Sequence, residues 1–298
     1  MVEVVRGRRR TAGWTAVTRG VYVAAPKPAL GDRLRAWSLH LPDTAVLTHL
    51  TAAELRGWWL PDRVPQPVFA AVGVRQRHPQ RAGLHVTRLR QAPAVEEVEG
   101  VRVATSAATL LACARDLGVL DLVILADSAL RLGHCTIEDL AGHARGQRGA
   151  PALRAILPLL DPRSESPWES VMRVLHRAAD IEVEPQHEIH DDRGAFVARA
   201  DLWLVRTRRI HEYDGEVHRT IDTHRDDLDR DRRLLEIAWE RCGWTSKEVL
   251  RRGASLITSA DTALGRRWDP DRLRAWQALV ADSLYGSVGR TRVASRWS

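Results

Sequence analysis

The sequence predicts an α/β protein of two domains, an N-terminal α+β region over residues 1–160 and a C-terminal domain over residues 161–298. A chain of 298 residues with 44% hydrophobic content is long enough to bury two separate cores. Strand-like and helix-like apolar patterns occur in both halves. Between them, residues 160–166 (LDPRSES) have the proline, serine and charge content of a connector.

The N-terminal region opens with an expected β-hairpin over residues 14–23, in which Arg19-Gly20 supplies the turn. A helix over residues 28–41 and a short helix capped by Thr51 and Glu54 are expected next. The strand-like runs that follow are VPQPVFAAVGV, AGLHVTRLR and VEGVRVAT. The alternation of strands and helices indicates an α+β arrangement.

Residues 106–160 are predicted to be helical. Asp127 is a polar position on a strongly apolar helix, so an internal hydrogen bond is its expected role. His49 is interpreted as a buried hydrogen-bonding residue, because no second metal ligand stands at helical spacing from it.

The C-terminal half begins with a helix whose expected cap is Ser166, with Pro167 at its first position and Glu169 at its third. This spacing is a capping box, in which Glu169 reaches back to the Ser166 amide. One carboxylate oxygen can cap while the other binds a metal, so a structural and a functional role for Glu169 both stay open.

Three acidic residues stand in the strand-like runs FVARADLWLV and RRIHEYDG, where acidic side chains are disfavoured. Glu212 and Asp214 project to one side of their strand, and a neighbouring strand can bring Asp201 beside them. Converging carboxylates repel one another without a cation, and Mg²⁺ or Mn²⁺ prefers oxygen ligands. A metal site for phosphodiester chemistry is predicted; pairing of Asp201 with arginine and a simple turn at Asp214 are the alternatives.

The stretch 224–244 is expected to form one long helix with Leu228, Leu235 and Trp239 on its inner face and Gly243 at its end. Two amphipathic helices are expected after it. Residues 286–298 are expected to be a basic, flexible tail.

The segments SESPWES, RADLWLV, HEYDGEVHR, DDLDRDRRLL and CGW occur in this order within residues 164–245. They resemble the very-short-patch-repair-like endonuclease domain, a member of the PD-(D/E)XK nucleases. The resemblance implies a restriction-endonuclease-like α/β/α sandwich in which Asp201 and Glu212 bind a divalent metal and the helical Glu169 assists.

The motif lysine of these nucleases, two residues after the Glu, is replaced here by Asp214. The only lysines in the chain are Lys27 and Lys247. The resemblance therefore implies that His218 or Arg232 handles charge at the phosphate. Asp214 would orient His218 or bind a second ion through water.

The hairpin stretch from Trp14, W-x-x-V-x-R-G-V-Y, and the segment THLTAAELRGW resemble AbiEi-type abortive-infection antitoxins. In that family the hairpin is the wing of a winged-helix segment. Only a short stretch precedes it here, so we expect no complete DNA-reading helix. An ordinary N-terminal hairpin is the alternative.

The net charge of +7 and the sequence pI of about 10.1 favour DNA as a polyanionic partner, although a GC-rich genome would also favour arginine. No apolar run approaches the roughly 18 residues of a membrane span, and the N-terminus lacks a signal peptide. The three scattered cysteines match no disulfide or zinc pattern. We expect a cytoplasmic protein without a membrane partner.

Together these observations predict an Mg²⁺-dependent DNA endonuclease of DNA repair or phage defence. The alternative is a non-catalytic DNA-binding regulator of the toxin–antitoxin type with a degenerate nuclease fold. A toxin or defence-system protein would be its partner.

Overall fold

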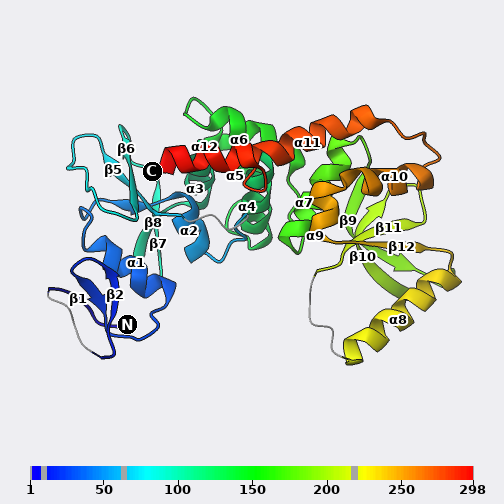
Figure 1. The fold of residues 1–298 in the computed structure, drawn as a ribbon, viewed down its shortest axis with the longest axis horizontal. Coiled ribbons are helices and arrows are strands. Elements are labelled where there is room, and N and C mark those ends of the chain that lie inside the picture. Colours follow the sequence, from blue (N-terminus) through cyan, green and yellow to red (C-terminus); the bar gives the residue numbers. More distant parts are fainter. Residues whose placement is uncertain (1, 8–11, 62–65, 216–220, 298) are drawn as a thin grey trace. The chain divides into compact units, whose positions relative to one another are not determined.

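The computed structural model describes residues 2–7, 12–61, 66–215 and 221–297, and the chain forms two compact units. Unit 1 comprises Met1–Leu117, His134–Arg154 and Thr291–Ser298, and unit 2 comprises Gly118–Gly133 and Ala155–Arg290. This division differs from a single boundary at residue 160, because residues 118–133 join unit 2 and the C-terminal residues join unit 1. Both units contain helices and strands, which confirms the predicted α/β class (Figure 1).

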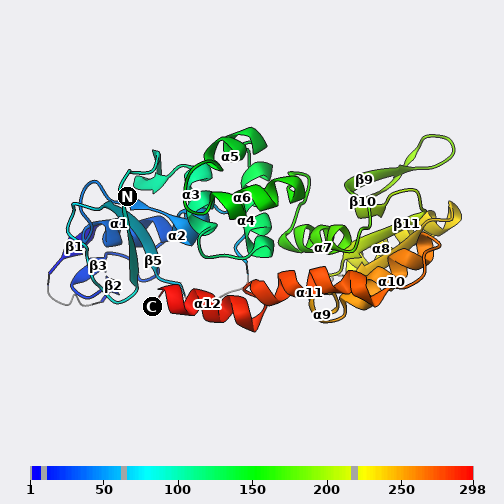
Figure 2. The same cartoon turned by 90° about the horizontal axis from the view of Figure 1, so that it is seen from above.

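Unit 1 begins with a three-stranded antiparallel sheet in the order β1-β3-β2. Its elements are β1 (Val4–Arg6), β2 (Thr15–Thr18), β3 (Val21–Val23) and the adjacent helix α1 (Leu30–Ser38). The antiparallel pairing of β2 and β3 confirms the predicted hairpin. Val21, Val23 and Ala36 form the small core between sheet and helix, which lie beside each other in Figures 1 and 2.

A second sheet in unit 1 has five strands in the order β6-β5-β4-β8-β7. The strands are β4 (Val46–Leu47), β5 (Val68–Gly73), β6 (Leu84–Leu89), β7 (Val95–Val98) and β8 (Val101–Ala104). The last two form a hairpin that the sequence analysis took as one strand. Glu99 and Gly100 both have positive φ angles, +52° and +74°, as a two-residue hairpin turn of right-handed twist requires.

The helices of unit 1 are short. They include α2 (His49–Leu55), α3 (Ser106–Cys113), α5 (Ile137–His143) and the first part of α6 (Ala150–Ile156). The predicted cap at Thr51 is wrong: the N-terminal flanking residue of α2 is Thr48, three residues earlier, and the Thr51 hydroxyl instead accepts a 2.9 Å hydrogen bond from the Phe69 amide.

Unit 2 is built around a four-stranded sheet in the order β12-β11-β10-β9. Its strands are β9 (Val183–His190), β10 (Phe196–Leu204), β11 (Arg209–Tyr213) and β12 (Glu240–Trp244). β11 and β12 run parallel, and the other pairs are antiparallel. The helices of this unit are α4 (Val119–Arg131), α7 (Pro167–Ala178), α8 (Ile221–Glu236), α9 (Ser246–Arg251), α10 (Gly253–Ala263) and α11 (Leu273–Asp282), with 3₁₀ turns at Leu157–Leu159 and Pro270–Arg272.

A helix covers each face of this sheet. His211 and Ile210 are consecutive in β11, so their side chains point to opposite faces. His211 Nδ1 lies 2.9 Å from Nε2 of His176 on α7, whereas Ile210 shares an apolar cluster with Leu234 on α8. The unit therefore has helix, sheet and helix layers (Figure 1).

The predicted long helix over residues 224–244 is wrong at its C-terminal end. α8 ends at Glu236, and Ala238 adopts a left-handed conformation with φ +57°. The amides of Ala238 and Trp239 donate back to the carbonyls of Leu235 and Leu234, a Schellman closure that leads into β12. The inner face is set by Leu234, because Leu235 is 70% exposed.

The predicted flexible tail is also wrong. Residues 287–297 form α12 (Ser287–Trp297), whose end packs within unit 1. Trp297 meets the edge of Phe69 at 4.9 Å between ring centroids, and its indole Nε1 donates to Asp116 over 3.2 Å. Arg296 forms an ion pair with the same carboxylate at 3.1 Å.

Within the ranges that the structure describes, none of the helices combines the length and the hydrophobicity that crossing a bilayer demands.

Candidate functional site

The start of α7 places Glu169. As predicted, Ser166 caps the helix by accepting the Glu169 amide over 3.2 Å, and Pro167 occupies the first position. The Glu169 carboxylate reaches one residue further back than predicted. Its Oε2 accepts the Glu165 amide over 2.7 Å and the Gln186 side-chain amide over 2.8 Å. The side chain is therefore buried and held from two directions.

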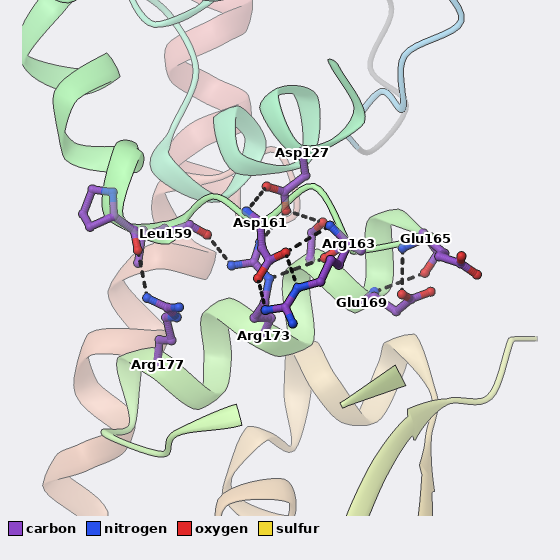
Figure 3. Close-up of polar contacts among 12 residues, drawn as sticks. Asp127, Leu159, Asp161, Arg163, Glu165, Glu169, Arg173 and Arg177 are labelled. Atoms are coloured by element: carbon purple, nitrogen blue, oxygen red, sulfur yellow. Dashed lines mark hydrogen bonds and ion pairs between the residues drawn. The ribbon is translucent and has the colours of Figure 1, made fainter. Parts of the chain in front are cut away.

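A buried polar network fixes α7 against α4 (Figure 3). Asp127 of α4 forms an ion pair with Arg173 of α7, and both side chains are fully buried. The Asp127 carboxylate also accepts the Ser170 hydroxyl over 2.6 Å and the Asp161 amide over 2.9 Å. Arg173 donates in addition to the carbonyl of Leu159. The predicted internal hydrogen bonding of Asp127 is confirmed, and it anchors the segment that leads to Glu169.

Asp201 and Glu212 lie on the neighbouring strands β10 and β11. The antiparallel register pairs Leu202 with His211, which places Asp201 opposite Glu212 on the same face of the sheet. Oδ2 of Asp201 accepts the Tyr213 amide over 2.9 Å. Glu212 is 4% exposed. The sheet therefore brings together the two carboxylates that the sequence predicts as metal ligands.

The environment of Asp201 disfavours its charged form. Burial first, and then the neighbouring Glu169 and Glu212, raise the pKa of Asp201 to about 7, although the Tyr213 amide and Arg230 work in the opposite direction. Burial also raises the pKa of Glu169. Near neutral pH, Asp201 is thus balanced between holding a proton and holding a negative charge that a nearby cation would stabilise.

Two arginines that the sequence analysis did not single out neutralise Glu212. Its Oε2 accepts from Arg230 Nη2 of α8 over 2.6 Å and from Arg241 Nε of β12 over 2.5 Å. Arg241 Nη2 also bonds Asp214 Oδ1 over 2.7 Å. Burial opposes the charge of Arg241, but its bond to Glu212 and the other nearby carboxylates raise its pKa above the ordinary range.

Gly243 lets Asp214 approach β12. A Cβ atom on Gly243 would lie 1.9 Å from Oδ2 of Asp214, so no other residue fits without moving that carboxylate. The Asp214 amide donates to the Trp244 carbonyl over 2.9 Å. Asp214 thus continues the pairing of β11 with β12, and its carboxylate bonds Arg241. The position where the motif has a positively charged lysine therefore holds a negatively charged side chain.

The two remaining predicted residues have different outcomes. Arg232 is exposed and pairs with Asp229 at 3.0 Å, one turn away on α8, and not with the carboxylates around Glu212. His218 lies outside the described residues.

The carboxylates offer part of a ligand set for a hard divalent cation. Among the residues that the structure describes, no group of three or more His, Cys, Asp and Glu side chains is arranged to hold a metal ion. Oε1 of Glu212, however, is buried and has no hydrogen-bond partner within that part of the chain. Mg²⁺ is commonly bound through one or two carboxylates, with water and phosphate completing its coordination. Asp201 and Glu212 fit this requirement.

Comparison with known proteins gives relatives without an assigned activity. The chain is 33% identical over 236 residues to the uncharacterized proteins MT2308 and Rv2248 of two Mycobacterium tuberculosis strains, which covers 77% of this chain and 84% of each relative. No protein-family model matches the chain. At this identity and coverage, the chain belongs to the same family as these mycobacterial proteins.

Proposed function

We propose that the protein is an Mg²⁺- or Mn²⁺-dependent DNA endonuclease whose site lies in unit 2. The observation that carries the proposal is the placement of Asp201 opposite Glu212. One carboxylate oxygen of Glu212 is buried and has no hydrogen-bond partner among the described residues, so a cation could bind it. The second support is that burial, together with repulsion by Glu169 and Glu212, raises the pKa of Asp201 to about 7. A purely structural site gains nothing from such destabilisation, whereas active sites are often built on it.

The architecture of unit 2 supports a restriction-endonuclease-like sandwich. Along the chain, α7 is followed by β9, β10, β11, α8 and β12, and helices cover both faces of the sheet. Glu169 lies on α7, Asp201 on β10 and Glu212 on β11. These are the residues to which the resemblance to very-short-patch-repair-like endonucleases assigns metal binding, which Glu169 assists. The motif residues come from three elements of one layered unit.

Residues of this chain would hold the metal ion, orient its ligands and supply positive charge beside the phosphate. Asp201 and Glu212 would hold the ion; Mg²⁺ bound there would lower the pKa of water and neutralise charge on the phosphate. The Tyr213 amide orients Asp201, and Arg230 and Arg241 orient Glu212. Positive charge at the phosphate would come from these two arginines rather than from a motif lysine.

His218 is proposed to transfer a proton or to stabilise charge at the scissile phosphate. Imidazole titrates near neutrality and can both donate and accept a proton, unlike an unperturbed lysine. His218→Ala should lower cleavage by about 10²-fold or more. The affinities for metal and DNA should change little.

DNA is the proposed partner, bound mainly through charge. The net charge of +7 supports this. Log affinity should fall linearly with log salt concentration, with little preference among duplex sequences. A strong sequence preference that persists at high salt would contradict this and assign DNA reading to unit 1.

A non-catalytic DNA-binding regulator, acting with a toxin or defence-system protein, is the second candidate. The observation that favours it is the neutralisation of Glu212 and Asp214 by Arg241. Ion pairs of this kind would leave the acidic residues structural. A regulator would bind DNA equally well with and without a divalent cation.

A cleavage assay separates the two candidates. Plasmid and single-stranded DNA are incubated with the protein and Mg²⁺ or Mn²⁺, with chelator as the blank. We expect cleavage by the wild type, loss of cleavage in Asp201→Ala, and full cleavage in the control Asp192→Ala, which removes an exposed carboxylate outside the site. DNA binding without cleavage in any metal would support the regulator instead.

A further inference from the structure

Unit 1 contains a cavity of about 580 Å³ that is separate from the carboxylate site. Its walls come from the end of β6 and the segment after it, from α3, and from residues 143–148. The volume falls within the range of roughly 300–1,000 Å³ that is typical of sites for small molecules. The cavity shares no residue with the proposed nuclease site, so neither proposal depends on the other.

The charged side chains that line this cavity are all basic. Among the residues that the structure describes, its wall includes Arg90, Arg115 and Arg148 but no aspartate or glutamate. Within the described parts of the chain, none of the three guanidinium groups forms an ion pair. Burial, and then the nearby Arg148, lower the pKa of Arg115, although the Asp116 carboxylate acts in the opposite direction. An excess of positive charge of this kind favours an anion, and above all phosphate, which matches the geometry of guanidinium groups.

The remaining wall is partly apolar and partly hydrogen-bonding. Leu89, Ala108 and Leu111 supply apolar surface. The polar groups are two hydroxyls and two carboxamides, from Thr48, Thr87, Gln91 and Gln147. Inorganic phosphate would fill only a small part of the volume, and a hydrocarbon body would leave the polar groups without partners. A ligand body with apolar faces and hydrogen-bonding edges, such as a nucleoside, suits both parts of the wall.

The loop of residues 146–149, which forms one wall of the cavity, is held against α3 and the residues that follow it. Arg115 Nε donates to the carbonyl of Arg148 over 3.3 Å. Gly149 has a φ of +93°, and a Cβ atom there would lie 2.7 Å from the Leu111 carbonyl. Only glycine allows the loop to pass this close to the helix. The wall is therefore pre-formed rather than open loop surface.

His49, a buried residue of the cavity wall, has a strained backbone conformation. Its φ of +50° is unusual for a residue other than glycine. Thr48 Oγ1 lies 2.7 Å from its Nδ1, and its ring stacks on Phe69 at 5.0 Å. Burial lowers the pKa of His49 to about 4, against the opposing effect of Asp116, whose carboxylate lies 3.8 Å from Nε2, so the ring is neutral at pH 7. Retained backbone strain of this kind is typical of ligand sites.

We propose that this cavity binds a phosphorylated nucleoside, with the phosphate at Arg90, Arg115 and Arg148 and the nucleoside against α3 and His49. The dianionic phosphate would offset most of the positive charge of the three guanidinium groups. Unit 1 would then be the part of the protein that senses a small molecule.

Calorimetry with the full-length protein tests this, using the four nucleoside 5′-monophosphates, the matching nucleosides and inorganic phosphate as probes. We expect at least one monophosphate to bind with a dissociation constant below about 1 mM, and its nucleoside to bind about 10-fold or more weakly. Arg115→Gln and Arg148→Gln should each weaken binding by about 10-fold or more, because each removes a charge-assisted hydrogen bond. Arg102→Gln, on an exposed position of β8, should leave it unchanged.

Arg148 is exposed, so its replacement leaves the core intact even if Arg115→Gln impairs folding. Absence of binding by all four monophosphates, or equal affinity in Arg148→Gln and the wild type, would overturn the proposal. Displacement of the bound monophosphate by duplex DNA, with the same loss of DNA affinity in Arg148→Gln, would also overturn it and assign the cavity to DNA contact.

Discussion

Replacing Asp201 with Asn should stabilise the protein in the absence of divalent metal. The change removes a carboxylate whose charged form is destabilised first by burial and then by repulsion from Glu169 and Glu212. The Asn side-chain oxygen can still accept the Tyr213 amide, which Asp201 now accepts over 2.9 Å. The substitution therefore removes the charge and keeps the shape and the hydrogen bond.

The magnitude follows from the pKa of Asp201. Raising a carboxyl pKa from 3.8 to about 7 opposes folding by about 4 kcal/mol above pH 7, at 1.36 kcal/mol per pH unit. The Asp201 side chain is partly exposed, and solvent screens the repulsion, so we expect a gain of about 1–3 kcal/mol from Asp201→Asn at pH 8.

The stability gain from Asp201→Asn should depend on pH. Because the folded-state pKa of Asp201 lies above its ordinary value, the folded protein binds more protons than the unfolded chain between about pH 4 and pH 7. The contribution of Asp201 to the free energy of unfolding falls as the pH rises through this window. The gain from Asp201→Asn should therefore be near zero at pH 4 and full at pH 8.

Urea denaturation in chelator at both pH values measures this gain, with Asp192→Asn as the exposed control. A loss of stability at pH 8, or the same change at both pH values, would refute the electrostatic account of the site.

Three further substitutions test the fold, two of them in unit 2, which holds the site, and one in unit 1. Arg173→Met leaves a buried carboxylate without its partner and should lower the free energy of unfolding by about 3–5 kcal/mol; Arg177→Met, which removes an exposed bond to a carbonyl, should cost less than about 1 kcal/mol in the same urea titration, and equal losses would contradict the network. Trp297→Ala should destabilise unit 1 by about 1–3 kcal/mol, measured by hydrogen exchange of its strands, whereas unchanged protection would mean that the C-terminal helix is not docked. Gly243→Ala should cost about 1–3 kcal/mol because its Cβ would meet the Asp214 carboxylate at 1.9 Å, and an unchanged thermal midpoint would contradict that contact.

Local chemistry made several features predictable from the sequence. The hairpin over residues 14–23 follows from strand-forming residues around an Arg-Gly turn, and the start of α7 follows from Ser166 and Pro167. The internal role of Asp127 follows from a charge on an apolar helix. For the hairpin and the start of α7, the residues that give the signal lie within the element itself. For Asp127 the sequence indicates that the carboxylate needs internal partners, but it does not identify them, because they lie 34 to 46 residues away.

Features in which distant segments meet are not predictable from local sequence patterns. Residues 240–244 continue a helical pattern, and only pairing with β11 makes them a strand. The contacts of Arg241 with Glu212 and Asp214 depend on that pairing, so they could not be anticipated once this stretch was assigned to a helix. Likewise, the basic C-terminal segment becomes a docked helix through Asp116, which is far away in sequence.

The central claim is that Asp201 and Glu212 hold a divalent cation, and calorimetric titration with Mg²⁺ and Mn²⁺ at pH 6.5 tests it most directly. Because the pKa of Asp201 is about 7, cation binding should release a proton, and the observed enthalpy should change with the ionisation enthalpy of the buffer. We predict binding with proton release in the wild type, and loss of both in Asp201→Asn and Glu212→Gln. Equal metal affinity in the wild type and both variants would contradict the claim.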